Sequence, residues 1–148
     1  MSLPIMTGTG RLTADPELRF SPSGVAVATM NLAFNARKFD RDRNEWVDGD
    51  VFFIRGTLFK QEAENVAESL TKGCEIVVTG RLKTEQWTDR NTGDKRSATS
   101  LLIDSIGPSL KYATAKPQKA ARASNSAPAA DDPWGAANAP QQTEEPPF

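Results

Sequence analysis

The sequence predicts an all-β fold, a small barrel of five long strands with one helix, followed by a tail without regular structure. Two segments, Val25–Arg37 and Cys74–Asp89, alternate apolar and polar residues with a period of two, which indicates half-buried strands. Only Glu62–Leu70 has the spacing of an amphipathic helix. Beyond Tyr112 the composition changes to Ala, Pro, Ser, Asn and Gln, which cannot bury enough apolar surface to offset the entropy of ordering.

Turn residues divide the first part of the chain into strands. The apolar, Thr- and Gly-rich segment Leu3–Leu12 predicts the first strand. Leu18–Phe20 predicts a short strand, because Asp15-Pro16 before it and Ser21–Gly24 after it are turn signals. Val25–Arg37 predicts the second long strand, and its even positions are all apolar.

A charged segment separates this strand from the next one. Lys38–Gly49 predicts a mobile hairpin loop, in which Phe39 and Trp46 are two aromatic residues that need a partner or a ligand. Asp50–Phe59 predicts the third long strand. Its core face should take Phe52 and Ile54, and its other face Phe53, Arg55 and Phe59.

One short helix is expected between the third and fourth long strands. Within Glu62–Leu70 the apolar residues at helical spacing are Ala63, Val66, Ala67 and Leu70. Lys72-Gly73, a cation followed by a glycine, should end this helix. Further along, Arg90–Asp94 predicts a hairpin turn. Arg96–Ile106 predicts the last strand, which Gly107-Pro108 should end.

The central strand, Cys74–Asp89, has two different faces. The even positions that point to the core are Ile76, Val78, Gly80 and Leu82. The odd positions carry two cations, Arg81 and Lys83, and further along the indole of Trp87. Cations suit phosphates and a flat aromatic ring suits a base. A solvated strand whose Trp packs against a neighbour would give the same pattern.

Composition argues against an enzyme. The 148 residues include no His and one Cys, Cys74, so the commonest general base is absent and no intrachain disulfide is possible. No nucleotide-binding glycine motif occurs either. We therefore expect no catalytic residues, no cofactor and no metal site, with Cys74 acting as a small apolar residue at a strand start. No window is apolar enough to span a membrane and Met1–Gly10 does not resemble a signal peptide, which predicts a cytoplasmic protein without a membrane partner.

The net charge of −1 hides an asymmetry along the chain. Met1–Tyr112 carries 15 Lys or Arg and 15 Asp or Glu, so this part is neutral. Ala113–Asn125 carries bases and no acid, whereas Ser126–Phe148 carries acids and no base. We expect a folded domain over Met1–Tyr112 and a disordered Ala- and Pro-rich linker with an acidic tip over Ala113–Phe148.

The order of the expected elements predicts a particular barrel. Five strands with one short helix between the third and fourth are typical of the OB-fold, a Greek-key barrel that binds oligonucleotides on one sheet face. Parity on three strands places the following side chains on non-core faces: Thr29, Asn31, Asn35, Arg37, Phe53, Arg55, Arg81, Lys83 and Trp87. Because three strands agree, a binding face is favoured over a purely structural sheet.

Longer motifs carry a family resemblance. The segments that carry it are Asp15–Phe20 with Gly24–Ala28, Ala63–Gly73 and Gly80–Asp89. In these segments the chain resembles the bacterial-type single-stranded DNA-binding proteins, and the likeness extends over its whole length. Glu45–Gly49 and Ile106–Lys116 resemble actinobacterial members, and a phage-encoded member is the alternative source.

The resemblance implies how DNA would be bound. The family stacks bases on aromatic residues at four places, which here are Phe39, Phe53, Phe59 and Trp87. Phe39 and Phe53 stand where the best-known members have Trp, which keeps the aromatic face and reduces the ring area. The residues expected to contact phosphates are Arg37, Lys38, Arg41, Arg43, Arg55, Lys60, Arg81 and Lys83.

The end of the chain carries a second resemblance. Family members finish with an acidic run, an apolar residue, Pro and a terminal Phe, which replication and repair proteins capture. Thr143–Phe148 has two acids, and Pro146 replaces the expected aliphatic residue. The partner-binding tip would consist of Glu144, Glu145, Pro147 and Phe148. Asp131–Trp134 is a second short acidic motif.

The resemblance implies sequence-independent binding and protection of single-stranded DNA in replication, recombination and repair. It also implies a homotetramer, around which the family wraps DNA, and a nucleoid-associated location. Two alternatives are an RNA-binding or accessory OB protein that has lost DNA affinity, and an oligomeric scaffold that works only through its tail. Retention of all four aromatic residues argues against both.

Overall fold

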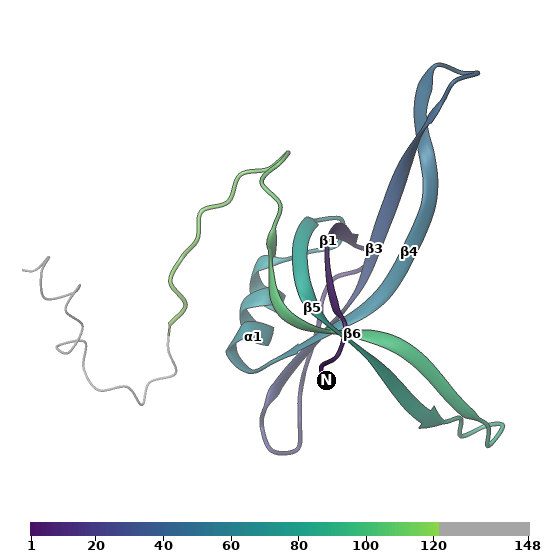
Figure 1. The fold of residues 1–148 in the computed structure, drawn as a ribbon. Coiled ribbons are helices and arrows are strands. Elements are labelled where there is room, and N and C mark those ends of the chain that lie inside the picture. The colour runs from purple at the N-terminus through teal and green to yellow at the C-terminus, as the bar shows by residue number, and fades with distance from the viewer. Residues whose placement is uncertain (122–148) are drawn as a thin grey trace, which may run out of the picture. The chain divides into compact units, whose positions relative to one another are not determined.

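Strands form where the sequence alternates apolar and polar residues. The computed structural model describes residues 1–121. Its strands are β1 (Ile5–Leu12), β2 (Glu17–Phe20), β3 (Ala26–Asp40), β4 (Glu45–Phe59), β5 (Glu75–Thr88) and β6 (Lys95–Pro108), and its helix α1 spans Lys60–Ser69 (Figure 1). All of these elements belong to one compact unit, Met1–Lys116. The acidic tip predicted at the end of the chain lies outside the described residues.

The six strands form one sheet that closes on itself. The strand order is β1-β5-β6-β4-β3-β2, and β1 also pairs with β3 at Arg11 and Leu12, which closes the barrel. The β4–β6 pair is parallel, and the other pairs are antiparallel. This closed sheet with one helix confirms the expected OB-fold barrel.

The barrel interior is filled by the apolar positions of the alternating strands. Among its fully buried side chains are Leu12, Leu32, Leu58, Ile76, Val78 and Leu101. Helix α1 contributes Ala63 and Val66, and Leu70 follows it into the core. The predicted core face of the central strand is therefore confirmed. Cys74 also lies as expected, since it precedes β5 and packs against this core.

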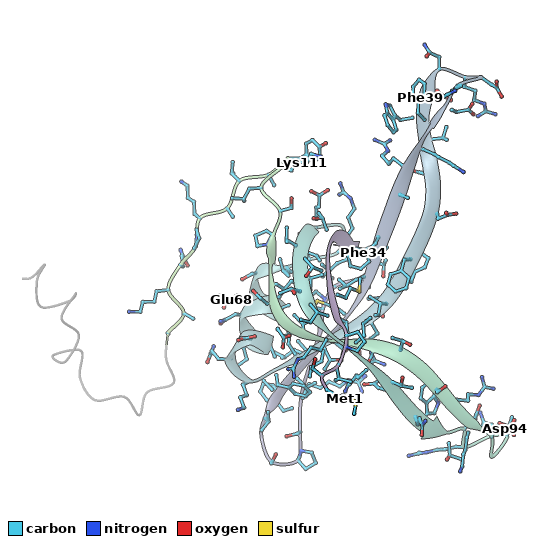
Figure 2. All side chains as sticks on the ribbon, in the orientation of Figure 1. Met1, Phe34, Phe39, Glu68, Asp94 and Lys111 are labelled. Carbon is cyan, nitrogen blue, oxygen red and sulfur yellow. The ribbon has the colours of Figure 1, made fainter. Side chains whose placement is uncertain are left out.

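Closure of the barrel depends on glycines in β1. A Cβ atom on Gly10 would lie 2.7 Å from the carbonyl oxygen of Ala33 and 2.8 Å from the ring of Phe34. A Cβ atom on Gly8 would lie 3.1 Å from the same ring. These approaches leave no room for a side chain, so the two glycines allow β1 to lie against Phe34 on β3 (Figure 2).

Two long hairpins project from the barrel in different directions (Figure 1). We call residues 35–51 the β3–β4 arm and residues 83–100 the β5–β6 arm. A β-bulge lies at or near the base of each arm. In the first, Gly49 and Asp50 of β4 lie opposite Ala36 alone, and in the second Asp104 is the extra residue of β6.

The β3–β4 arm corrects the prediction of a loop over Lys38–Gly49. Strand pairing continues to Asp40 and resumes at Glu45, so that only four residues form the turn. Within the turn, Asn44 adopts a positive φ of 51°. The ribbon is solvated on both faces, so it lacks the apolar alternation that marks a strand in sequence. Phe52, expected in the core, is 50% exposed, and its ring lies 6.2 Å from that of Phe34, its cross-strand partner.

Element ends account for the remaining corrections. Helix α1 begins at Lys60, whose φ of 64° turns the chain sharply out of β4, and it ends at Ser69 because Leu70 is already extended. Gly73 therefore does not cap the helix. It has a φ of 85° in the turn before β5 and donates its backbone N–H to Leu12. Strand β6 continues through Gly107-Pro108, which pair with β5 instead of ending the strand before them.

Candidate nucleic-acid interface

Register joins the predicted binding residues into one sheet face. Directly paired residues project from the same face, and one such row crosses four strands as Asn31, Arg55, Ser100 and Lys83. In this row Ser100 is buried, so the other three residues form the accessible surface. Alternation along β4 adds Phe53 to the face of Arg55, and alternation along β5 adds Trp87 to the face of Lys83. The structure thus brings Phe53 and Arg55 of β4 together with Lys83 and Trp87 of β5 on a common surface, which we call the outer face.

The four predicted stacking residues are all exposed. The exposed fractions of these residues are 43% for Phe39, 67% for Phe53, 42% for Phe59 and 48% for Trp87. Within residues 1–121, Phe53, Phe59 and Trp87 make no contact with another aromatic ring. Exposure alone does not mark a binding site, because Phe20 and Phe52 are equally exposed, at 61% and 50%. What distinguishes Phe53 and Trp87 is that they share the outer face with Arg55 and Lys83.

Phe39 differs from the other three because it has an aromatic neighbour. Its ring packs edge-on against Trp46, with centroids 5.4 Å apart and an interplanar angle of 64°. The two residues are direct cross-strand partners near the end of the β3–β4 arm, where Figure 2 labels Phe39. Trp46 is 62% exposed.

The predicted phosphate contacts fall into two groups. Arg81 is held by Asp104, with Nη2 2.9 Å from Oδ1 and Nε 3.2 Å from the same oxygen, and Lys83 Nζ lies 3.2 Å from Glu85 Oε1. Arg43 approaches Glu45 at 4.0 Å. The other five predicted contacts have no ion pair in the described part of the chain: Arg37, Lys38, Arg41, Arg55 and Lys60.

Two shallow hollows border the outer face. One, of about 310 Å³, lies beside Trp87 and is lined by Gln86, Trp87, Thr88, Lys95, Arg96 and Ser97. The other, of about 450 Å³, is lined by Ala14, Asp15, Glu17, Thr29, Met30, Asn31 and Arg55. The first has two cations, of which Arg96 is ion-paired with Asp89 and Lys95 has no ion pair in the described residues. The second brings two carboxylates toward Arg55, which makes that edge less favourable for a phosphate.

Two features of the site could not be predicted from the sequence. Asp104, which holds Arg81, becomes its neighbour through a bulge that leaves no mark in the sequence. Trp46 stands out in the sequence as an aromatic residue among charged ones. However, position 46 is even and position 53 is odd, so regular alternation along β4 would put Trp46 and Phe53 on opposite faces. The bulge at Gly49 and Asp50 reverses this parity and turns Trp46 to the side of Phe39.

The thiol of Cys74 lies at the start of β5. Its Sγ is 3.4 Å from the Thr71 hydroxyl, and hydrogen bonds from the Thr71 side chain and backbone lower the pKa of this thiol. Among residues 1–121, no group of His, Cys, Asp and Glu is arranged to hold a metal ion. In the same residues, helix α1 is too short and too polar to cross a bilayer.

Comparison with known proteins identifies the family of this chain. Residues 5–109 match the family described as "Single-strand binding protein family". This chain belongs to that family. The family is one of binding proteins and not of enzymes.

Relatives of the family extend the likeness to almost the full chain. The single-stranded DNA-binding protein of Mycolicibacterium smegmatis is 46% identical, over 97% of this chain and 96% of its own length. That of Paenarthrobacter aurescens is 45% identical, over 88% and 85%. A crystal structure of a small single-stranded DNA-binding protein from Streptomyces coelicolor superposes with a TM-score of 0.63 at 29% identity, and covers 74% of this chain and 97% of that one. The expected likeness to actinobacterial members is confirmed.

Proposed function

We propose that this chain binds single-stranded DNA without sequence preference. The observation that carries the proposal is the outer face itself, where well-exposed aromatic rings alternate with cations on a sheet that otherwise buries its apolar residues. Every base has a flat π-face, so a base of any kind can stack on such rings, for about 1–3 kcal/mol each. In a duplex the bases are already stacked and paired, so the rings cannot reach them.

The residues in this proposal divide by chemistry. The stacking residues are Phe39, Phe53, Phe59 and Trp87. The phosphate contacts are Arg37, Lys38, Arg41, Arg43, Arg55, Lys60, Arg81 and Lys83. The cations follow the DNA backbone and make binding dependent on salt, whereas stacking contributes a part that salt does not screen.

A competition experiment tests this function. Mixed-sequence single strands and duplexes of equal length are titrated into the full-length protein while its Trp fluorescence is recorded. We expect single strands of any sequence to quench the fluorescence at low concentration and duplexes to bind far more weakly. A duplex that binds as well as the single strand would contradict the stacking mechanism. Tighter binding to single-stranded RNA than to single-stranded DNA would favour the RNA-binding alternative.

Self-association extends the proposal to a homotetramer. Strand β1 pairs with β5 along one edge. Along its other edge it pairs with β3 only at Arg11 and Leu12, so the rest of that edge has no strand partner in the described chain. Leu3, Ile5 and Val77 are exposed beside this edge. An open edge with apolar neighbours suits pairing with a second copy, and several copies supply a longer DNA path than one neutral barrel. Light scattering at micromolar concentration should give four times the chain mass, and a monomer would contradict the assembly.

The tail has a separate role in the proposal. Glu144, Glu145, Pro147 and Phe148 dock replication and repair proteins, because a Phe ring with a free carboxylate and preceding acids suits a basic pocket with an apolar floor. The protein thereby serves replication, recombination and repair on DNA in the cytoplasm. Deletion of residues 144–148 should abolish capture of these partners and leave DNA affinity equal or slightly higher at low salt. Capture that survives the deletion would assign docking elsewhere, with Asp131–Trp134 the next segment to remove.

A further inference from the structure

Resting on the proposed function, we infer that the β3–β4 arm carries an additional binding subsite for one nucleobase, formed by Trp46 with Phe39 as its support. The inference starts from exposure. Trp46 is the more exposed ring of the pair, at 62% against 43% for Phe39. In an edge-on pair one ring directs its edge at the face of the other, so only part of the aromatic surface is used between them. The remainder of the indole surface is open to a ligand.

The bulge in β4 places Trp46 on the DNA-binding side. Asn35 pairs with Val51 but Arg37 pairs with Asp48, so the strand gains one residue between the two pairs. Because the side-chain period of a strand is two, this extra residue moves Trp46 from the face opposite Phe53 to the same face. Without the bulge, Trp46 and Phe39 would not be cross-strand partners.

Distance separates this subsite from the outer face of the barrel. Phe53 pairs with Ala33 and Trp46 pairs with Phe39, so the two aromatic positions are six residues apart along β3. At about 3.3 Å per residue the separation is roughly 20 Å, too far for one base to touch both. A base on Trp46 therefore belongs to a different nucleotide from the base on Phe53.

Charge near the pair favours a nucleotide over an apolar ligand. Arg37 lies two residues from Phe39 on the same face, with Asp48 as its cross-strand partner. Arg41 begins the turn beyond the Asp40–Glu45 pair, which follows the aromatic pair. Neither cation has an ion pair in the described chain. A ring with unpaired cations on either side matches the alternation of base and phosphate along a single strand.

Proteins with one fluorescent Trp test the subsite directly. The sequence has three Trp residues, 46, 87 and 134, so Trp87→Phe with Trp134→Phe leaves Trp46 as the reporter. Trp46→Phe with Trp134→Phe leaves Trp87. Both full-length proteins are titrated with the same mixed-sequence single strand. We expect quenching of both reporters. Quenching of Trp87 alone overturns the subsite and leaves the proposed function intact, whereas failure of both to respond overturns the function and the subsite together.

Affinity measurements separate a direct contact from an indirect one. Trp46→Ala should weaken single-strand binding by about 5- to 150-fold without changing the salt dependence, because stacking releases no counterion. Val47→Ala is the matched control, since Val47 is the next residue on the opposite face of the same strand. Trp46→Ala is then repeated in a Phe39→Ala protein. A further loss there supports direct contact with DNA. No further loss means that Trp46 only holds Phe39 in place, and it overturns the inference.

Discussion

The two arms of the protein carry similar residues in different electrostatic settings. Each has an exposed aromatic ring and several cations. On the β5–β6 side, Arg81 is bound to Asp104, Lys83 to Glu85 and Arg96 to Asp89, and Arg90 and Lys95 near the turn have no ion pair within residues 1–121. On the β3–β4 arm, Arg37, Lys38 and Arg41 have no ion pair within residues 1–121. A count of cations would therefore overestimate what the β5–β6 side offers to a phosphate.

This difference in ion pairing predicts how each arm should contribute to DNA binding. An unpaired cation that meets a phosphate gains a partner and loses none. A paired cation must give up or share its carboxylate, so its net gain is smaller. We therefore expect Arg81, Lys83 and Arg96 to add little to binding beside Trp87, and the β3–β4 side to combine stacking with phosphate contacts.

The largest expected effect comes from removal of one ring on each side. Phe53→Ala with Trp87→Ala should weaken single-strand binding by about 2–6 kcal/mol, the sum of two stacked bases. The single variants show whether the two sides contribute equally. Phe20→Ala is a suitable control, because Phe20 is 61% exposed and lies on β2 on the face opposite to that of Phe59. Equal losses in the control and the double variant would show that exposed rings matter only for solubility or folding.

Stability should distinguish the bulges of the two arms. A Cβ atom on Gly80 would lie 2.4 Å from the carbonyl oxygen of Leu102, whereas one on Gly49 would lie 3.1 Å from that of Ala36. Gly80→Ala must therefore displace backbone and should lower the free energy of unfolding by about 1–3 kcal/mol. Gly49→Ala should lower it less. Urea unfolding of both variants measures the order, and the reverse order would mean that the β5–β6 bulge yields more easily than its geometry indicates.

The salt dependence of binding should distinguish paired from unpaired arginines. Arg55→Gln should reduce the slope of log K against log salt by about 0.7, the value for one phosphate on a single strand. Arg81→Gln should reduce it less, because Arg81 is already neutralised by Asp104. Both slopes come from titrations at several salt concentrations. An equal reduction would mean that Arg81 leaves Asp104 when DNA binds.

The smallest effect should come from release of a paired cation. Asp104→Asn frees Arg81 and should strengthen binding at low salt by less than about 1 kcal/mol, with the gain lost as salt screens it. Glu68→Gln is the matched control, because it also removes one acid but lies on the exposed side of α1. If both variants bind equally well, net charge and not the release of Arg81 explains any gain.

The sequence allowed prediction of the barrel because burial imposes alternation. Val25–Arg37 and Cys74–Asp89 alternate since one side faces the core, and the core positions Ile76 and Val78 follow directly from that pattern. The same logic failed for Lys38–Gly49, where the paired strands bury nothing and charges occupy both faces. Hydrogen-bonded pairing without burial leaves no periodic signal.

The candidate site was only partly predictable for a related reason. Parity correctly placed Phe53, Arg55 and Trp87 off the core, because no bulge lies between them and the buried positions that set the phase. Parity cannot be carried past a bulge, so it missed the alignment of Trp46 with Phe39. Ion pairs between distant residues, such as Arg81 with Asp104, also depend on register that a single sequence does not reveal.

The different directions of the two arms have a mechanical consequence (Figure 1). A single strand that touches Phe39 near the end of one arm and Trp87 on the other follows a bent path. The distance between its ends is then shorter than its contour length. Tension applied to the ends works against this path and favours release of one arm before the other. A motor that pulls on the strand would thus displace the protein by force alone, without competing for any of its contacts.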